Sequence, residues 1–331
     1  MTVNAPPAQR TDSEPFLILA PMRGLTDAVF RNAFADSFGG FHSAMAPFIS
    51  TVSARRYKPS QLRDVLPENN RGPALIPQIL SNDPEDFAAL ARVLFDLGYP
   101  VVNWNLGCPF RRVAGKLRGS GLLPHPDRID AFLDQALAGM PNRLSIKTRL
   151  GRHKNNELLS LMPVFNRYPL AELIVHPRTG IQMYTGAPDL EAYGACLAAT
   201  SLPVVFNGDI GDLVTFQTLS EQFPQTAGWM IGRGALANPW LPTLIRRGGR
   251  IGVPVNVETV RRFHDRLLDE YCRIFSGPAH PVDRMKGLWS YLSLSFADGR
   301  RFLKQVQKTS TVDRYRETVD RFFDTHPEWI A

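Results

Sequence analysis

The sequence predicts a (β/α)8 TIM barrel followed by a small C-terminal all-α helical bundle. Short apolar runs alternate with helical patterns eight times over about 230 residues, the repeat number and length of such a barrel. After residue 240 the strand patterns end and amphipathic helix patterns follow. A length of 331 residues with 44% hydrophobic residues suits a barrel with an appended domain.

The expected strands are short and apolar, as in a buried parallel sheet. They span 16–20, 41–46, 74–80, 101–106, 144–150, 172–176, 203–207 and 228–232. Helical patterns lie between them, such as 83–97, which opens with Asp-Pro, and 126–138. A doubly wound sheet is the alternative fold. The barrel is preferred because no Gly-x-Gly-x-x-Gly turn follows the first strand.

Composition limits the kind of protein. The formal net charge of +7 favours an anionic partner such as nucleic acid, although many basic proteins bind none. Cys108, Cys196 and Cys272 are far apart and odd in number, so we expect no disulfide framework, no metal site and a reducing, cytoplasmic location. No run approaches 18 apolar residues, so no membrane span is expected.

Three segments are expected. Residues 1–14 are polar and contain Pro and Ala without an apolar core, which indicates a disordered tail rather than a signal peptide. Residues 15–245 form the barrel domain and 255–331 the helical domain, with an Arg- and Gly-rich linker between them. A monomer is the expected state.

The strand at 101–106 leads into Asn-x-Gly-Cys-Pro at 105–109. Pro109 biases Cys108 away from the α region, and Gly107 permits a close backbone approach. A thiol held beside an amide suits proton transfer or nucleophilic attack. The alternative is a structural role, because free cysteine is often a small buried hydrophobe.

Polar groups also follow the other strands, and the strand C-termini of a TIM barrel form its active site. Core packing does not explain why Lys147, His176 and Arg178 should face one mouth. Asn-Gly-Asp at 207–209 and Ile-Gly-Arg-Gly-Ala at 231–235 follow the last two strands, where such barrels bind phosphate. Glycine N–H groups and the Arg233 guanidinium suit phosphate oxygens.

These motifs together resemble the tRNA-dihydrouridine synthases. The matching segments are Ala-Pro-Met-x-Gly-Leu-Thr-Asp (20–27), Asn-x-Gly-Cys-Pro (105–109), Lys-Leu-x-Gly-Ser (116–120), Lys-x-Arg-x-Gly (147–151), Val-His-x-Arg-Thr (175–179), Asn-Gly-Asp-Ile (207–210) and Ile-Gly-Arg-Gly-Ala (231–235). They occur in family order between about 16 and 240. Arg23 and Pro177 depart from the usual family residues.

The resemblance implies an FMN-dependent enzyme that reduces the C5–C6 double bond of a uridine in tRNA, with NADPH as reductant. Ribosomal RNA is not excluded as the target. The residues implied for cofactor binding are Pro21, Met22, Arg23, Gln78, Lys147, His176, Asn207, Gly208, Asp209, Gly232 and Arg233. Those implied for the substrate are Asn105, Arg149, Arg178, Gln182 and Tyr184. Cys108 would be the general acid, since an ordinary thiol with a pKa near 8.5 is protonated at pH 7.

The C-terminal region carries much of the positive charge. From 240 to 331 there are 16 Lys and Arg against 11 Asp and Glu, a net +5. The residues expected to contact RNA phosphates are Arg284, Lys286, Arg300, Arg301, Lys304 and Lys308, of which 300, 304 and 308 share a helical face. Such charges alternatively form only a solvated face. Trp289 and Tyr291 are expected in the core rather than stacked on bases.

Two other functions remain open. One is an FMN barrel oxidoreductase for a small molecule such as dihydroorotate, but a small substrate needs no basic helical domain. The other is a non-catalytic RNA-binding barrel, which would not need Cys108 or the phosphate motifs. The sequence does not show which uridine is reduced.

Overall fold

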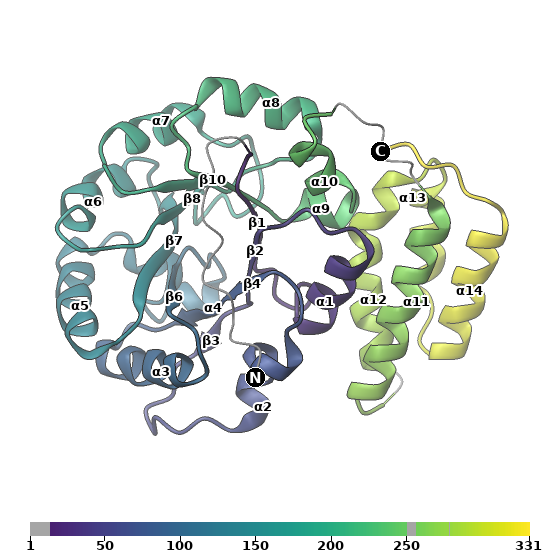
Figure 1. Cartoon of the computed structure of the whole chain (residues 1–331), viewed down its shortest axis with the longest axis horizontal. Coiled ribbons are helices and arrows are strands. Elements are labelled where there is room, and N and C mark those ends of the chain that lie inside the picture. Colours follow the sequence, from purple (N-terminus) through teal and green to yellow (C-terminus); the bar gives the residue numbers. More distant parts are fainter. Residues whose placement is uncertain (1–13, 250–255, 278) are drawn as a thin grey trace.

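A computed structural model describes residues 14–249, 256–277 and 279–331, and it has the expected TIM barrel (Figure 1). In these residues the strands are β1 (Leu17–Leu19), β2 (Ser43–Met45), β3 (Ile49–Ser50), β4 (Ala74–Ile76), β5 (Gln78–Leu80), β6 (Val101–Leu106), β7 (Arg143–Gly151), β8 (Leu173–Thr179), β9 (Val204–Phe206) and β10 (Gly228–Ile231). Each of the eight predicted strands is present. The run at 74–80 is divided into β4 and β5 at Pro77, and β3 is an addition.

The parallel sheet closes on itself through the segment 74–80. β4 pairs with β2, β5 pairs with β6, and the order from β6 to β10 leads back to β1. Pro77 cannot donate to this ladder, but its carbonyl accepts from Asn103 N at 2.9 Å. A closed parallel sheet directs the C-terminal ends of all its strands to one mouth.

The strand side chains alternate between two buried layers. Leu17 and Leu19 pack in the large cluster between sheet and helices, whereas Ile18 belongs to a separate cluster that includes Ile174 and Met230. Because successive strand residues point to opposite faces, this second cluster fills the barrel interior. The interior is therefore solid below the mouth.

Helices surround the barrel (Figure 1). They are α1 (Ala28–Ser37), α2 (Pro59–Leu62), α3 (Pro84–Asp96), α4 (Arg111–Ala114), α5 (Pro126–Gly139), α6 (Glu157–Phe165), α7 (Leu190–Ala198), α8 (Leu213–Gln222), α9 (Arg233–Ala237) and α10 (Leu241–Arg246). The predicted start of α3 is confirmed: Pro84 is its first residue, and the Asp83 carboxylate accepts from Asp86 N.

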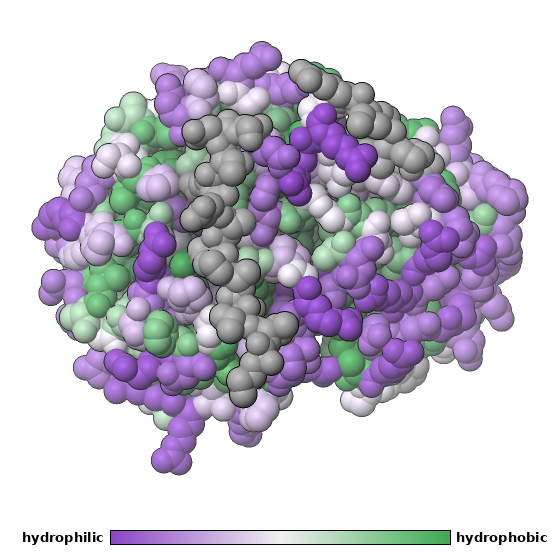
Figure 2. Space-filling model, viewed as in Figure 1, coloured by the Kyte–Doolittle hydropathy of each residue, from purple (hydrophilic) through white to green (hydrophobic). Residues whose placement is uncertain are grey.

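The C-terminal region is the predicted helical bundle. It comprises α11 (Val257–Ile274), α12 (Ala279–Leu292), α13 (Gly299–Val306) and α14 (Val312–Asp324). The bundle packs on α1, where the Phe263 ring of α11 lies 5.7 Å from that of Phe30 and 5.1 Å from that of Phe38. Its side of the molecule is mostly hydrophilic in the view of Figure 2. Trp289 is fully buried, as predicted.

Parts of the expected tail and linker, residues 1–13 and 250–255, lie outside the described residues. Glu14, the last residue of the predicted tail, is described, and its carboxylate pairs with Arg246 of α10 at 2.7 Å. The exact boundary between barrel and helical domain stays a prediction. No helix among the described residues is long and apolar enough to cross a membrane.

Candidate active site

A cavity of about 560 Å³ opens at the mouth of the barrel, within the size range of cofactor and ligand sites. All the residues predicted for catalysis and cofactor binding line it, together with Asn105, Arg149 and Tyr184. Arg178 and Gln182 are absent from the lining. The sequence thus identified most of the wall, and the chemical roles of these residues stay predictions.

The loop that carries Cys108 is fixed by hydrogen bonds on both sides. The Asn105 side-chain oxygen accepts from Gly107 N at 3.1 Å and from Cys108 N at 2.9 Å. Ser120 donates to the Cys108 carbonyl from its backbone N at 3.1 Å and from Oγ at 3.0 Å. The backbone of Cys108 therefore has little freedom, which fixes where the thiol leaves it.

The segment after this loop explains the Lys-Leu-x-Gly-Ser motif. Gly119 has a φ of +56°, and a Cβ there would lie 2.8 Å from the Cys108 carbonyl oxygen and 2.9 Å from Cys108 Cβ. A larger residue would displace the cysteine. Burial raises the pKa of the Cys108 thiol, although the Phe110 N–H and the nearby Arg149 charge oppose this effect. The group is therefore a protonated thiol at neutral pH, as a general acid requires.

Lys147 brings a positive charge into the cavity without a counter-ion. It follows Ile146 on β7, and none of the described carboxylates lies within ion-pair distance of it. Burial, reinforced by the Arg149 charge, lowers the pKa of Lys147 to about 7. An unpaired buried cation of this kind is suited to an electron-rich ligand.

Arg178 lies behind the cavity wall rather than in it, and its expected substrate contact stays a prediction. Its side chain is 1% exposed and forms an ion pair with Asp209. Its Nη1 lies 3.0 Å from His176 Nε2. Because a guanidinium only donates, Nε2 must accept, and the proton of the neutral ring sits on Nδ1. Burial and the surrounding arginines hold the pKa of His176 well below its usual value, which keeps the ring neutral.

Asp209 joins the two arginines of this wall, since it also pairs with Arg233. Partial burial alone would raise the pKa of Asp209, but Arg178 and Arg233 lower it overall. The carboxylate therefore holds Arg233 at the end of β10. Asp209 also lines the cavity, and its predicted contact with the cofactor stays a prediction.

Arg149 connects the cysteine loop to the loop after β8. Its Nε donates to the Gly107 carbonyl at 3.0 Å, and its Nη1 donates to the carbonyls of Thr179 and Met183 at 2.9 and 2.6 Å. Its Cζ also lies 5.2 Å from the Tyr184 ring. Burial lowers the pKa of Arg149 to about 10, so it stays a cation at neutral pH.

Gln182 shapes this second loop instead of lining the cavity. Its Oε1 accepts from Thr179 N at 2.7 Å and from Thr179 Oγ1 at 3.0 Å. Its predicted contact with the substrate stays a prediction.

A chain of buried amides underlies the wall, and part of it escaped the sequence analysis. Gln78 Nε2 donates to Asn103 Oδ1 at 2.8 Å, and Asn103 Nδ2 donates to Ser145 Oγ at 2.8 Å. Asn105 Nδ2 donates to Gln78 Oε1 at 2.7 Å. Asn103, polar within a buried strand, was the available signal. The chain orients Asn105, which in turn holds the cysteine loop.

A model of the family "Dihydrouridine synthase (Dus)" matches residues 18–309. The chain belongs to the dihydrouridine synthase family. It is 31% identical over 230 residues to a probable tRNA-dihydrouridine synthase of Rhodobacter capsulatus, covering 69% of each chain. It is 28% identical to tRNA-dihydrouridine synthase B of Vibrio cholerae, covering 93% of this chain and 95% of the relative.

Solved structures support the barrel fold of this dihydrouridine synthase family member. The old yellow enzyme homologue of Zymomonas mobilis superposes with a TM-score of 0.51 at 10% identity, covering 73% of this chain and 91% of its own. A morphinone reductase variant in complex with tetrahydroNAD gives 0.50 at 11% identity, covering 74% and 89%.

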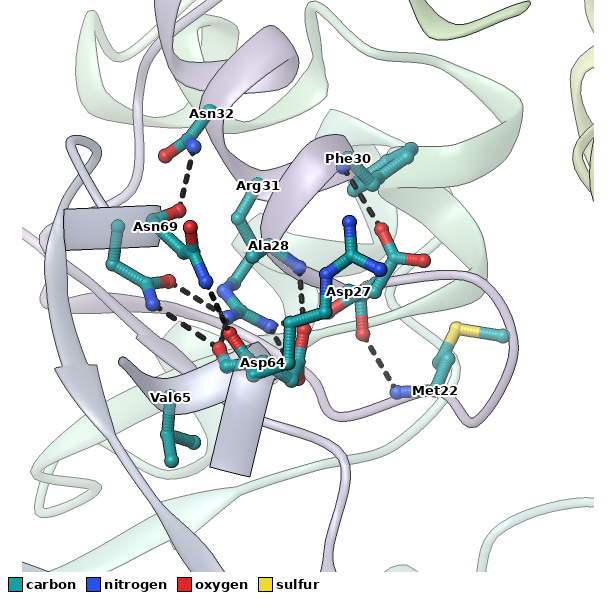
Figure 3. Close-up of polar contacts among 12 residues, drawn as sticks. Met22, Asp27, Ala28, Phe30, Arg31, Asn32, Asp64, Val65 and Asn69 are labelled. Carbon is teal, nitrogen blue, oxygen red and sulfur yellow. Dashed lines mark hydrogen bonds and ion pairs between the residues drawn. The ribbon is translucent and has the colours of Figure 1, made fainter. Parts of the chain in front are cut away.

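The β1–α1 loop of this family member forms hydrogen bonds with both domains. Figure 3 shows those within the barrel. Asp27 caps α1 by accepting from Phe30 N at 3.1 Å and also accepts from Tyr271 Oη of α11 at 3.0 Å. Asp64 accepts from Ala28 N at 2.6 Å. These bonds fix the helix start that follows Met22, a residue of the cavity wall.

The cationic residues predicted for RNA binding divide into two groups. Arg284 and Lys286 are occupied within the protein: Arg284 Nη1 lies 3.6 Å from Asp27 Oδ2 at the domain interface, and Lys286 Nζ donates to the Thr309 carbonyl. Both side chains are half-buried and bridge structural elements, and their expected contact with RNA phosphates stays a prediction. The exposed group, here called the α13 patch, consists of Arg300, Arg301, Lys304 and Lys308.

The cavity mouth also contains residues that the sequence analysis missed. Phe48 lines it from the loop after β2, Phe110 from the loop after β6, and Arg112 from α4. Tyr291 of α12, expected in the core, packs against the core and also lines the cavity. The helical domain thus contributes directly to the mouth. Among the described residues no group of three His, Cys, Asp or Glu could hold a metal ion.

Proposed function

We propose that this protein is an FMN-dependent tRNA-dihydrouridine synthase that reduces the C5–C6 double bond of a uridine in tRNA with NADPH. The observation that carries the proposal is that Cys108 and a lysine without an ion-pair partner among the described residues, Lys147, line the wall of one barrel-mouth cavity. Membership of the family and the printed names of the relatives support tRNA as the substrate.

The donor set of the cavity fits a flavin mononucleotide. Lys147 and the Nδ1–H of His176 offer positive and donating groups for the electron-rich pyrimidine edge of the ring. Arg233, with the backbone of Gly208 and Gly232, suits the phosphate, and Asn207 lies beside them. When bound, FMN supplies the hydride that the uracil ring accepts at C6.

Cys108 is the source of the second hydrogen. Once C6 is reduced, C5 requires a proton, and the Sγ–H of Cys108 provides it while the S–H electron pair stays on sulfur. The Phe110 N–H and the Arg149 charge, which lower the pKa of this thiol, stabilise the thiolate that remains. Arg149 and Asn105 hold the loop, so they position the acid as well as facing the uracil.

RNA reaches this cavity only if the target base leaves its stack, which costs a few kcal/mol. We expect phosphate contacts with the α13 patch to offset part of that cost, because its cations are exposed.

The test is nucleoside analysis of an unmodified tRNA transcript incubated with purified, FMN-loaded protein and NADPH. The proposal predicts dihydrouridine at a defined position and none when NADPH is omitted. A protein that oxidises NADPH with a small enone but leaves the transcript unchanged, with ribosomal RNA also unchanged, would contradict it.

A further inference from the structure

The aromatic ring of Phe110 is exposed beside Cys108, the proposed general acid. Phe110 is two residues from Cys108, lines the cavity and is 44% exposed. A single exposed phenylalanine is common on protein surfaces, but here it forms part of the entrance that a substrate must cross. The half-buried Phe48 lines the same entrance.

Backbone hydrogen bonds fix the position of Phe110, while its side-chain ring stays exposed. The Phe110 carbonyl accepts from Val113 N at 2.8 Å and from Ala114 N at 2.9 Å, which starts α4. Its own N–H is near enough to the Cys108 thiol to lower the pKa of that thiol. The ring is therefore anchored next to the reacting thiol without being packed into the core.

Two cations on the wall of the same cavity have no neutralising partners in the described part of the chain. Arg23 and Arg112 are exposed, both line the cavity, and both are near enough to Cys108 for their charges to lower its pKa. Among the described residues neither has a carboxylate within 4 Å. The Arg23 guanidinium lies 5.9 Å from the Phe48 ring centroid. An exposed apolar ring and two free cations at one entrance complement a base attached to a phosphate.

We propose that Phe110, Arg23 and Arg112 form a docking site for one unpaired nucleotide next to the target uridine, here called the flanking-base platform. The neighbouring base stacks on Phe110, and its phosphates lie against the two arginines. This inference rests on the proposed function, because it assumes that the uridine beside Cys108 arrives within an RNA chain. Stacking on an aromatic ring tolerates any base, so the platform adds affinity without fixing the sequence.

The experiment measures Kd for an unmodified tRNA transcript, and KM for its reduction, with Phe110→Ala, Phe110→Leu and Phe110→Trp. Both Ala and Leu should raise Kd and KM roughly 5- to 100-fold, because neither offers an aromatic face, and Trp should restore binding. Phe95→Ala is the matched control, since Phe95 is equally exposed at 44% but lies on α3 away from the mouth. Unfolding midpoints and flavin content verify that each variant is folded.

A second measurement tests the phosphate contacts. An Arg23→Gln, Arg112→Gln double variant should reduce the slope of log K against log salt by about 0.7 for each phosphate of single-stranded RNA that an arginine no longer neutralises. The platform is refuted if Phe110→Leu binds like wild type, or if the slope is unchanged. A wild-type protein that forms no dihydrouridine would refute the proposed function instead, so the two failures are distinguishable.

Discussion

Replacing Lys147 with methionine should stabilise the flavin-free protein at neutral pH while impairing its reaction. Lys147 is half-buried in the cavity wall, lies near the Arg149 charge and has no carboxylate partner among the described residues. Its pKa is lowered from 10.5 to about 7, mainly by burial. Methionine keeps an unbranched apolar stem of similar length and removes the charge. Functional sites commonly retain such a locally unfavourable group.

The sign and size of the effect follow from this pKa. The folded pKa lies below the unfolded one, so between pH 7 and 10.5 the unfolded chain binds more protons, and the free energy of unfolding rises with pH. A tenfold change in a protonation equilibrium corresponds to about 1.4 kcal/mol. The change in the pKa of Lys147 from 10.5 to about 7 therefore sets an upper limit of about 5 kcal/mol on the gain in the free energy of unfolding. Because Lys147 is partly exposed to the cavity, we expect about 1–3 kcal/mol of stabilisation at pH 6.5.

The assay is urea unfolding of flavin-free protein at pH 6.5, 8 and 9.5. The midpoint of Lys147→Met should exceed that of wild type most at pH 6.5, and the difference should shrink as pH rises. Lys154→Met, at an exposed position on the loop after β7, is the control and should show no such trend. Equal midpoints for wild type and Lys147→Met at all three pH values would refute the reasoning.

Three further predictions concern the cofactor, the RNA and the domain interface. Arg233→Ala should weaken FMN binding by about 1.5–3 kcal/mol in fluorescence titrations, and undiminished binding would exclude Arg233 as a phosphate ligand. An Arg300→Ala, Arg301→Ala, Lys304→Ala variant should bind transcript with a salt slope reduced by about 2 to 3 in filter binding. An unchanged slope would indicate that these residues of α13 do not contact RNA phosphates. Asp27→Ala should lower the free energy of unfolding by about 1–3 kcal/mol, because it removes a helix cap and a bond to α11, and an unchanged urea midpoint would contradict this.

The barrel and most of its cavity could be predicted because their signals are local. Each strand is a short apolar run, and a polar residue just after it, such as Cys108 or Asn207, faces the mouth once the sheet closes. The register along a strand is fixed by alternation, so Asn105 and Arg149 also reach the cavity from their positions in sequence. Long-range information was not needed for these residues.

The residues that were missed or misplaced depend on contacts between distant segments. Arg284 resembles an exposed helical cation until α12 packs beside Asp27 of the barrel. Tyr291 reaches the mouth only because the helical domain packs against it. Arg178 lies near the end of a strand, where a substrate contact is expected. Its guanidinium instead pairs with Asp209, 31 residues later in the sequence, and lies behind the cavity wall. Helical or strand periodicity does not indicate which distant residues a side chain will contact.

The most direct test of the proposed mechanism separates the two half-reactions in Cys108→Ala. The FMN-loaded variant is mixed with NADPH and then, without oxygen, with an unmodified tRNA transcript, while the flavin absorbance is followed by stopped flow. The mechanism predicts flavin reduction at the wild-type rate but almost no reoxidation by tRNA and almost no dihydrouridine, because only the proton for C5 is missing. Dihydrouridine formed by this variant at the wild-type rate would contradict the assignment of Cys108 as the acid.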